Sequence, residues 1–319
     1  MRTITLEEHF VTANFLKASG AYASASPQFG KIQAQLLDLG AGRIAAMDQG
    51  GVDVQVLSLA AMGFDPLDAA TATSLARDIN DELAAAVNAH PERLAGFATL
   101  GMKDPSAAAK ELERCIHSLK FKGALLNGTV GGEFLDDPKF LPVLEAAQSL
   151  GVPVYLHPAP PPKRVKDVYF SGLPDAVSQM LSMAGWGWHA ETALHSLRLI
   201  VAGVFVRLPK LQVIIGHMGE GLPYALARSN QIMNSVTKLP QEVAAYFHQN
   251  FHVTTSGYFT VEPFHCALDV MGGIDRLMYS VDYPFSANAQ GQEFLKALTL
   301  GSTDMEKLTH ANAEKLLKL

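Results

Sequence analysis

The chain has 319 residues, of which 48% are apolar and 18% charged, and its net charge is −6. This composition excludes intrinsic disorder as the main state and a basic nucleic-acid surface. No apolar run approaches the roughly 20 residues of a membrane helix, the N-terminus is acidic where a signal peptide would be apolar, and two cysteines make no disulfide scaffold. We therefore expect a cytoplasmic protein with no nucleic-acid or membrane partner.

Eight short runs rich in Val, Ile and Leu are bounded by Gly, Pro or Asp, and we predict that each is a β-strand. In chain order they are Ile4–Leu6, Val54–Leu59, Leu94–Thr99, Gly123–Leu126, Pro153–Leu156, Gln212–Gly216, His252–Thr254 and Leu277–Val281. Most are continuously apolar, which is typical of parallel strands that are covered on both faces.

Stretches with helical periodicity lie between most of these strands. Residues Ala69–Ala89 repeat apolar side chains at helical spacing. A second helix is predicted over Pro105–Leu119, with Asp104 as its N-cap. A third covers Phe140–Leu150 and ends at Gly151, a suitable C-cap.

The alternation of strand and helix predicts an α/β fold, a (β/α)8 TIM barrel in a single domain over residues 1–319. Such a barrel needs about 250 residues, so we expect insertions after strands one and five. The first spans Val11 to Gln49, and the second is the proline-rich segment HPAPPPKRVKDVYFSGLPD. A doubly wound open sheet has the same local pattern, but no GxGxxG follows the first strand.

Polar side chains follow several of the predicted strands, at the barrel edge where TIM barrels carry their chemistry. In chain order they are Glu7, Glu8 and His9, then His157, His217, Glu220 and Asp282. Glu7 and His9 point the same way because side chains alternate along a strand. Carboxylates and imidazoles suit a divalent ion such as zinc or manganese, and His217 is free to act as an acid or base.

Other candidates have two interpretations each. Asn127, after strand four, either caps a turn or lines the pocket. Trp188 either packs in the core or forms the wall of an aromatic pocket. Cys115 and Cys266 are expected to be packing residues rather than nucleophiles.

Long stretches of the sequence resemble the amidohydrolase-related metal-dependent decarboxylases. This group includes aminocarboxymuconate semialdehyde decarboxylase and γ-resorcylate (2,6-dihydroxybenzoate) decarboxylase. The matching stretches are ITLEEHF, YLHP, ETALHSLRLIVAGVFVRLPKLQVIIGHMGEGLPYALAR, SVDYPF and HANAEKLLKL. The similarity covers about residues 2–319, GHMGEGLP is its most specific stretch, and Glu-x-His in the first strand resembles the γ-resorcylate type.

The resemblance implies particular roles for the strand-end residues. One zinc or manganese ion would be held by Glu7, His9, His157 and Asp282, with no organic cofactor. The catalytic set would be Asp282 as proton donor, assisted by His217 and Glu220. Arg228 matches an arginine of the family and either reaches a neighbouring active site or holds the rim. With Asn127, Trp188 and Phe285 it makes up the predicted substrate-binding residues, although the pairing of Trp188 with His189 is not expected of a γ-resorcylate enzyme.

These implications favour a decarboxylase that protonates the ring carbon of an ortho-hydroxybenzoate-type acid and releases CO2, working as a homodimer or homotetramer. The same residues would also serve a hydrolase of lactones or amides, in which a metal-bound water attacks the substrate. A third hypothesis is an inactive barrel that serves as a binding scaffold. One departure concerns Tyr283, because the family often has Trp there, and this residue is expected to bear on substrate choice.

Overall fold

The computed structural model describes residues 1–20, 27–61 and 63–319. Its strands are β1 (Ile4–Phe10), β2 (Val54–Leu59), β3 (Leu94–Gly96), β4 (Ala124–Asn127), β5 (Val154–His157), β6 (Val213–Ile215), β7 (Phe251–Thr254) and β8 (Leu277–Met278). Each predicted strand has its counterpart, with ends that differ by a few residues. The predicted strand Leu94–Thr99 is shorter because its pairing is reduced to one bridge beyond β3, from Ala98 to Ala124.

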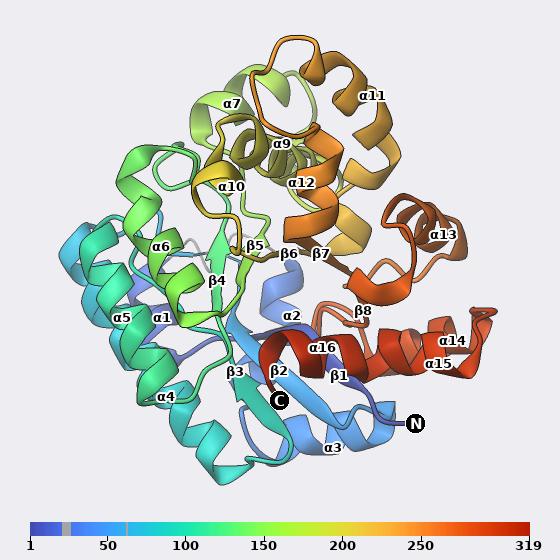
Figure 1. Ribbon diagram of the computed structural model, residues 1–319. Coiled ribbons are helices and arrows are strands. Elements are labelled where there is room, and N and C mark those ends of the chain that lie inside the picture. The colour runs from blue at the N-terminus through green and yellow to red at the C-terminus, as the bar shows by residue number, and fades with distance from the viewer. Residues whose placement is uncertain (21–26, 62) are drawn as a thin grey trace.

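All strand pairs are parallel, and the strands follow one another in chain order (Figure 1). β1 to β3 form one run and β4 to β8 a second. The Ala98–Ala124 bridge joins the two runs on one side. On the other side the His9 amide donates to the Tyr283 carbonyl over 2.7 Å. These contacts confirm the (β/α)8 barrel.

Helices surround the barrel and connect its strands (Figure 1). They are α1 (Ala13–Ser19), α2 (Pro27–Leu37), α3 (Ala41–Gly50), α4 (Ala69–Ala89), α5 (Pro105–His117), α6 (Leu141–Leu150), α7 (Lys163–Tyr169), α8 (Asp175–Ser182), α9 (Gly187–Val201), α10 (Val204–Arg207), α11 (Leu222–Asn234), α12 (Val243–Asn250), α13 (Val261–Val270), α14 (Asn288–Ala297), α15 (Ser302–Glu306) and α16 (Asn312–Leu317). The longest connections follow β1, with α1 to α3, and β5, with α7 to α10.

Local sequence signals set the helix ends. The Asp104 carboxylate accepts a hydrogen bond from the Ala107 amide over 3.0 Å, so it is the N-cap of α5. Gly151 ends α6 in the left-handed conformation, with φ of 63°. Both features agree with the sequence-based expectation.

The seam between β1 and β8 is held by two buried side chains. The Ser280 hydroxyl accepts the amides of Leu6 and Glu7 and donates to Glu8 Oε1 over 3.0 Å. The Glu8 carboxylate also accepts the amides of Val281 and Tyr283, each over 2.9 Å. Hydrogen bonds to side chains therefore replace the regular backbone hydrogen bonds between β1 and β8. Glu8 points into this seam and away from the mouth of the barrel.

The barrel interior is packed with apolar side chains. Ile4, Leu6, Val56, Phe97 and Ile214 form part of one buried cluster, against which Ala313 and Leu317 of α16 also pack. A second, larger cluster fills the space between the strands and the outer helices. The barrel is thus a solid scaffold, and its polar groups gather at the ends of the strands.

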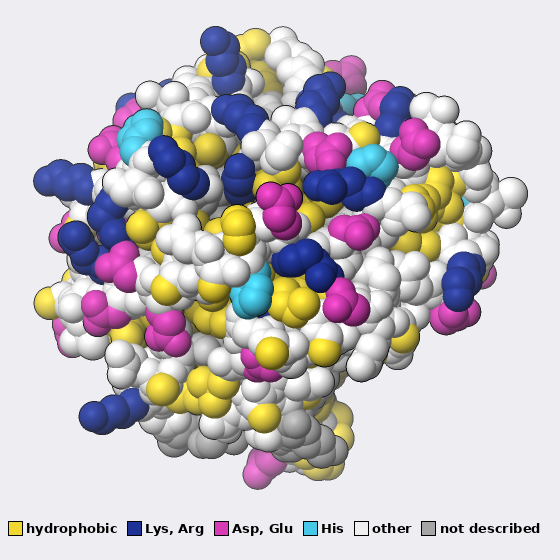
Figure 2. Space-filling model, turned by 90° about the horizontal axis from the view of Figure 1, so that it is seen from below, with side chains coloured by type: hydrophobic (Ala, Val, Ile, Leu, Met, Phe, Trp, Pro, Cys, Tyr) yellow, Lys and Arg dark blue, Asp and Glu magenta, His cyan; other side chains and the backbone are white. Residues whose placement is uncertain are grey.

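Basic and acidic side chains are interspersed over the face seen in Figure 2. No helix within the described ranges has both the length and the apolar character that crossing a bilayer requires. Cys115 and Cys266 are free thiols, and Cys115 is buried.

Candidate active site

Side chains from four strand ends converge at the mouth of the barrel. One ligand-type atom from each of Glu7, His157, His217 and Asp282 lies within 4.8 Å of the others. Glu7 Oε1 is 2.9 Å from His157 Nε2 and 3.5 Å from His217 Nε2. His9 adjoins this group, with its Nε2 atom 3.1 Å from Asp282 Oδ1. The convergence joins residues that are far apart in the sequence.

The cluster fits a divalent metal ion. Glu7 Oε1 and His9 Nε2 are buried and make no hydrogen bond to any described residue. Buried polar atoms are rarely left unpaired, and lone pairs that converge in this way are those of a ligand set. Gly216 makes room for the carboxylate, since a Cβ there would lie 2.2 Å from Glu7 Oε2. A mixed carboxylate and imidazole set suits zinc or manganese.

The electrostatic environment separates the two carboxyl groups of the cluster. Burial alone would raise the pKa of Glu7, but the positive charges of His217 and His157 outweigh it and hold the pKa well below its usual range. For Asp282 the burial effect wins over the attraction of His217 and raises the pKa to about 7. Two carboxyl groups whose pKa values are pushed apart can serve as an anion and an acid, respectively.

His217 is oriented by a second group of polar residues. Its Nδ1 atom lies 2.8 Å from Glu220 Oε1, and the other Glu220 oxygen pairs with Nδ1 of His189. Burial lowers the pKa of His217, but the Glu7 and Glu220 carboxylates overcome this and raise it to about 10. The Trp188 indole N–H donates to His189 Nε2 over 3.1 Å, and His189 Nδ1 donates to the Glu220 carboxylate, which can only accept.

The backbone around these residues is strained. His217, Met218, Glu220 and Asp282 have φ values of 45°, 56°, 58° and 69°. Side chains other than glycine disfavour this left-handed region, and such residues gather where function requires a fixed orientation. The loop after β6 therefore holds His217 and Glu220 at a cost in stability.

Two further residues support the cluster. Tyr155 lies two positions before His157 on β5, and its hydroxyl donates to Glu7 Oε2. The same hydroxyl is 2.7 Å from Thr254 Oγ1. Ser58 Oγ lies 3.3 Å from His9 Nδ1 and so fixes that ring. Alternation along the strand could have identified Tyr155, because residues i and i+2 face the same side.

A cavity of about 230 Å³ lies over the cluster. His9, His157, His217 and Asp282 line its polar side. Two predicted substrate-binding residues, Trp188 and Phe285, line it as well, and the ring of Phe285 meets that of His9 edge-on at 5.6 Å. The aromatic walls and the charged floor suit a flat anionic ring.

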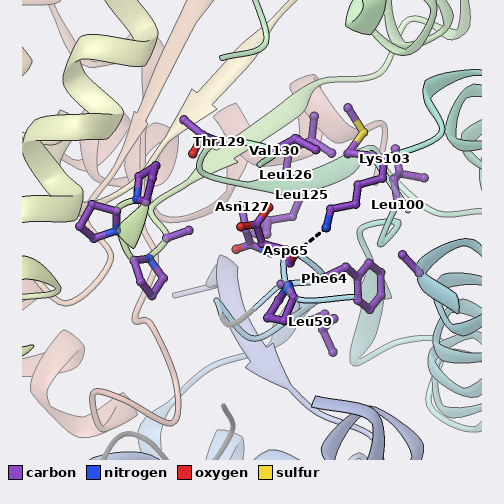
Figure 3. A pocket seen from close by; sticks show the side chains of 18 of the residues that line it. Leu59, Phe64, Asp65, Leu100, Lys103, Leu125, Leu126, Asn127, Thr129 and Val130 are labelled. Carbon is purple, nitrogen blue, oxygen red and sulfur yellow. Dashed lines mark hydrogen bonds between the residues drawn. The ribbon is translucent and has the colours of Figure 1, made fainter. Parts of the chain in front are cut away.

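The other predicted substrate-binding residues lie elsewhere. Asn127 lines a separate, neighbouring cavity (Figure 3). Arg228 is exposed on α11, where its Nη1 atom is 3.2 Å from Gln231, and it lines neither cavity. Tyr283 also lines neither cavity, and the Arg43 guanidinium lies 5.1 Å from its ring centre. The departure at Tyr283 is thus a packing difference in this chain.

Sequence reasoning did not include His189 among the catalytic residues or metal ligands. His189 belongs to α9, in the long connection after β5, and no strand-end pattern marks it. The cluster of ligand-type atoms contains His217, which was predicted not to be a metal ligand. His9, which was predicted to be one, lies beside the cluster and contacts Asp282. Register alone could not distinguish these two histidines, because both project into the same mouth.

Comparisons with known proteins agree with this geometry. A family model described as amidohydrolase matches residues 32–319. A γ-resorcylate decarboxylase from Polaromonas sp. is 36% identical over 328 residues, which cover 99% of this chain and 98% of that protein. The crystal structure of a 2,6-dihydroxybenzoate decarboxylase complexed with 2,6-dihydroxybenzoate has a TM-score of 0.91 at 35% identity, with full coverage of both chains.

A further solved structure contains a metal ion. A dihydroxybenzoic acid decarboxylase from Polaromonas sp., crystallised with manganese and 2-nitroresorcinol, has a TM-score of 0.86 at 35% identity. The match covers 100% of this chain and 97% of that one.

Proposed function

The chain belongs to the amidohydrolase family, and we propose that within it the chain is a metal-dependent decarboxylase of ortho-hydroxybenzoate-type acids. The observation that carries this proposal is the cluster of Glu7, His157, His217 and Asp282 at the barrel mouth. Glu7, His157 and Asp282, with the adjoining His9, supply ligands for a metal, and His217, which Glu220 orients, stands beside them as a further polar group. The similarity to decarboxylases over nearly the full length supports this reaction over hydrolysis.

The chemistry explains why a proton donor is needed. Direct loss of CO2 from an aromatic ring would leave an aryl carbanion, which is too unstable to form. Protonation of the ring carbon that bears the carboxylate avoids that species, and an ortho hydroxyl group supplies the electron density. The C–C bond then breaks, its electron pair restores the aromatic ring, and CO2 leaves. No oxidant and no organic cofactor are required.

We assign the roles at the site as follows. Glu7, His9, His157 and Asp282 would hold one zinc or manganese ion, which when bound supplies Lewis acidity and a template for the phenolate and carboxylate. Asp282 delivers a proton to the ring carbon, and its burial favours the protonated form. His217, which Glu220 orients, stabilises the phenolate with its positive charge. Trp188 and Phe285 line the cavity and would contact the ring.

Some wider features belong to the same proposal. We infer one domain, a cytoplasmic location and a homodimer or homotetramer. Exposed aromatic side chains support the oligomer, since Tyr169, Trp186 and Tyr224 are 78%, 59% and 88% accessible. Arg228 lies about one helical turn after Tyr224 on α11. A second copy that covered this helix would therefore bring Arg228 into an interface.

The proposal is tested by CO2 release from a panel of ortho-hydroxybenzoates. The protein is loaded with zinc or manganese, and chelator-stripped protein is the blank. We expect release only with metal. Release of no CO2 from any member, together with metal-dependent cleavage of lactones or amides, would replace the decarboxylase with the hydrolase.

Asp282 is tested by its amide variant. Asp282→Asn removes the acidic proton but keeps the size of the side chain, and the loss of general acid catalysis costs about 10²–10⁴-fold in kcat. Circular dichroism and metal content show whether the fold and site persist. A folded, metal-loaded Asp282→Asn protein with the wild-type rate would remove Asp282 from the role of donor.

A further inference from the structure

A second cavity of about 400 Å³ lies beside the metal cavity and has no role in the reaction described above (Figure 3). It opens over the ends of β2, β3 and β4, and the proline-rich loop after β5 forms another wall. Leu59, Leu100, Leu126 and Val130 contribute apolar surface. Met183 lines both cavities, so the two spaces adjoin at this side chain.

Most polar groups in the walls of the second cavity are bound to other parts of the protein. The Lys103 ammonium donates to the carbonyls of Asp65 and Leu67, the second over 2.8 Å. The Asp65 carboxylate accepts the Gly131 amide over 2.6 Å. The Lys166 ammonium donates to the side-chain carbonyl of Gln179. These groups are already satisfied, and the wall that remains is mostly apolar.

Asn127 is the exception among the polar side chains that line the second cavity. Its Oδ1 atom is buried and has no hydrogen-bond partner among the described residues. Asn127 on β4 is in register with His157 on β5. Side chains in register on neighbouring parallel strands point to the same side, so the amide is adjacent to a proposed metal ligand.

The sizes of the two spaces indicate what the second one holds. Pockets for small molecules usually have at least about 300 Å³, and the metal cavity has 230 Å³. An ion and one hydroxybenzoate ring leave little of that volume free. A substituent on the ring must therefore lie elsewhere, and the second cavity offers space with an apolar lining.

We propose that the second cavity is a substrate subsite that takes an apolar alkyl or aryl substituent of the hydroxybenzoate ring. The subsite makes substituted ortho-hydroxybenzoates the preferred substrate class. The two cavities adjoin at Met183, and Asn127, in register with His157, offers its free carbonyl oxygen to a ring hydroxyl. This inference rests on the proposed decarboxylation, because the ring is placed by the same cluster.

The test compares 2-hydroxybenzoate with its propyl derivatives, one for each of the four free ring positions, on manganese-loaded protein. Burial of a methylene stabilises a complex by about 0.8 kcal/mol, which is about fourfold. At least one propyl isomer should therefore have a kcat/KM about 50-fold above that of the parent compound. A ratio of one or less for every isomer, with the parent turned over, would overturn the subsite but leave the decarboxylase.

A second test fills the cavity with a larger side chain and uses the same substitution at the surface as its control. Thr129→Phe places a ring in the second cavity from its rim, and Thr303→Phe makes the same change at an exposed position on α15. The propyl-to-parent ratio should fall at least tenfold in Thr129→Phe and stay at the wild-type value in Thr303→Phe. An unchanged ratio in Thr129→Phe would contradict the subsite.

A binding measurement separates this inference from the proposed reaction. If no compound is decarboxylated, the same pairs are compared by calorimetric dissociation constants. Tighter binding of a propyl isomer that Thr129→Phe abolishes would keep the subsite and overturn only the decarboxylase. Equal binding of all compounds would overturn the subsite as well.

Discussion

The two halves of the barrel mouth differ in chemistry although they are built from the same kind of strand. The ends of β1, β5, β6 and β8 carry Glu7, His157, His217 and Asp282. The ends of β2, β3 and β4 present mainly apolar side chains to the neighbouring cavity, with Asn127 at the border. Both halves stand on one packed core.

The difference shows how a barrel divides its tasks. Buried charges are costly unless they are paired, so the polar half holds its ionisable groups in a network that Tyr155, Glu220 and His189 complete. The apolar half does not need such pairing of charges, and side-chain packing determines its shape. Substitutions in the polar half should therefore change chemistry, and substitutions in the apolar half should change stability or substrate choice.

The largest effect is expected from a ligand in the polar half. His157→Ala removes an imidazole at the centre of the cluster, and we expect loss of bound metal together with at least a thousandfold loss of activity. His248→Ala, at an exposed position on α12, is the control and should match wild type. Elemental analysis and CO2 release measure both properties. Full metal content in an active His157→Ala protein would contradict the proposed ligand set.

A smaller effect is expected at the edge of the same network. His189→Phe keeps a ring under Trp188 but removes the proton that is donated to Glu220, so His217 is held less firmly. Changes to such supporting residues typically cost about 10–100-fold in activity. We expect this loss in kcat with metal content retained. An unaltered kcat would show that His189 has only a packing role.

The apolar half is expected to behave in the opposite way. Leu126 on β4 is 3% exposed, and Leu126→Ala should lower the free energy of unfolding by about 2–5 kcal/mol, because it leaves a cavity. Metal content should not change, since no proposed ligand is touched. Chemical denaturation and elemental analysis are the measurements. Loss of metal from the folded variant would mean that the two halves are not separable.

The smallest effect concerns a hydrogen bond between two connections of the barrel, the one that follows β4 and the one that follows β5. His195 on α9 is buried, and its Nε2 atom accepts the Leu135 amide over 2.8 Å. Burial lowers the pKa of His195 to about 3. The unfolded chain takes up the proton near the ordinary pKa of 6.5, so this contribution to stability is complete above that pH and is lost as the pH falls toward 3.

His195→Gln isolates this pH dependence, because glutamine keeps an acceptor for the Leu135 amide but does not titrate. Between pH 7 and 5 the wild type should lose about 2 kcal/mol more of unfolding free energy than the variant. Urea titrations of both proteins at the two pH values give this difference. Parallel losses would mean that His195 is protonated in the folded protein.

The sequence predicted the fold more fully than it predicted the site. Strand positions depend on local apolar runs, and the Asp104 and Gly151 caps are equally local, so these features could be read directly. Strand-end residues such as Glu7 and Asp282 followed from the fold. His189 could not be found in this way, because α9 reaches the mouth only through the packing of a long connection.

The limits of the prediction at the rim have the same cause. Asn127 was predicted to follow strand four, and it is the last residue of β4, but which cavity it lines depends on the proline-rich loop that forms the opposite wall. Arg228 is exposed in the single chain, so its predicted contact with substrate depends on a neighbouring copy. Local patterns describe what a strand or helix presents, whereas these positions depend on how distant segments meet.

The most direct test of decarboxylation at the polar half is the fate of the ring proton. Manganese-loaded protein is incubated with an ortho-hydroxybenzoate in D2O, and the product is examined by NMR. The account predicts a phenol with one deuterium at the carbon that carried the carboxylate, formed only when metal is present. No phenol with metal, or equal conversion after the metal is removed, would contradict it.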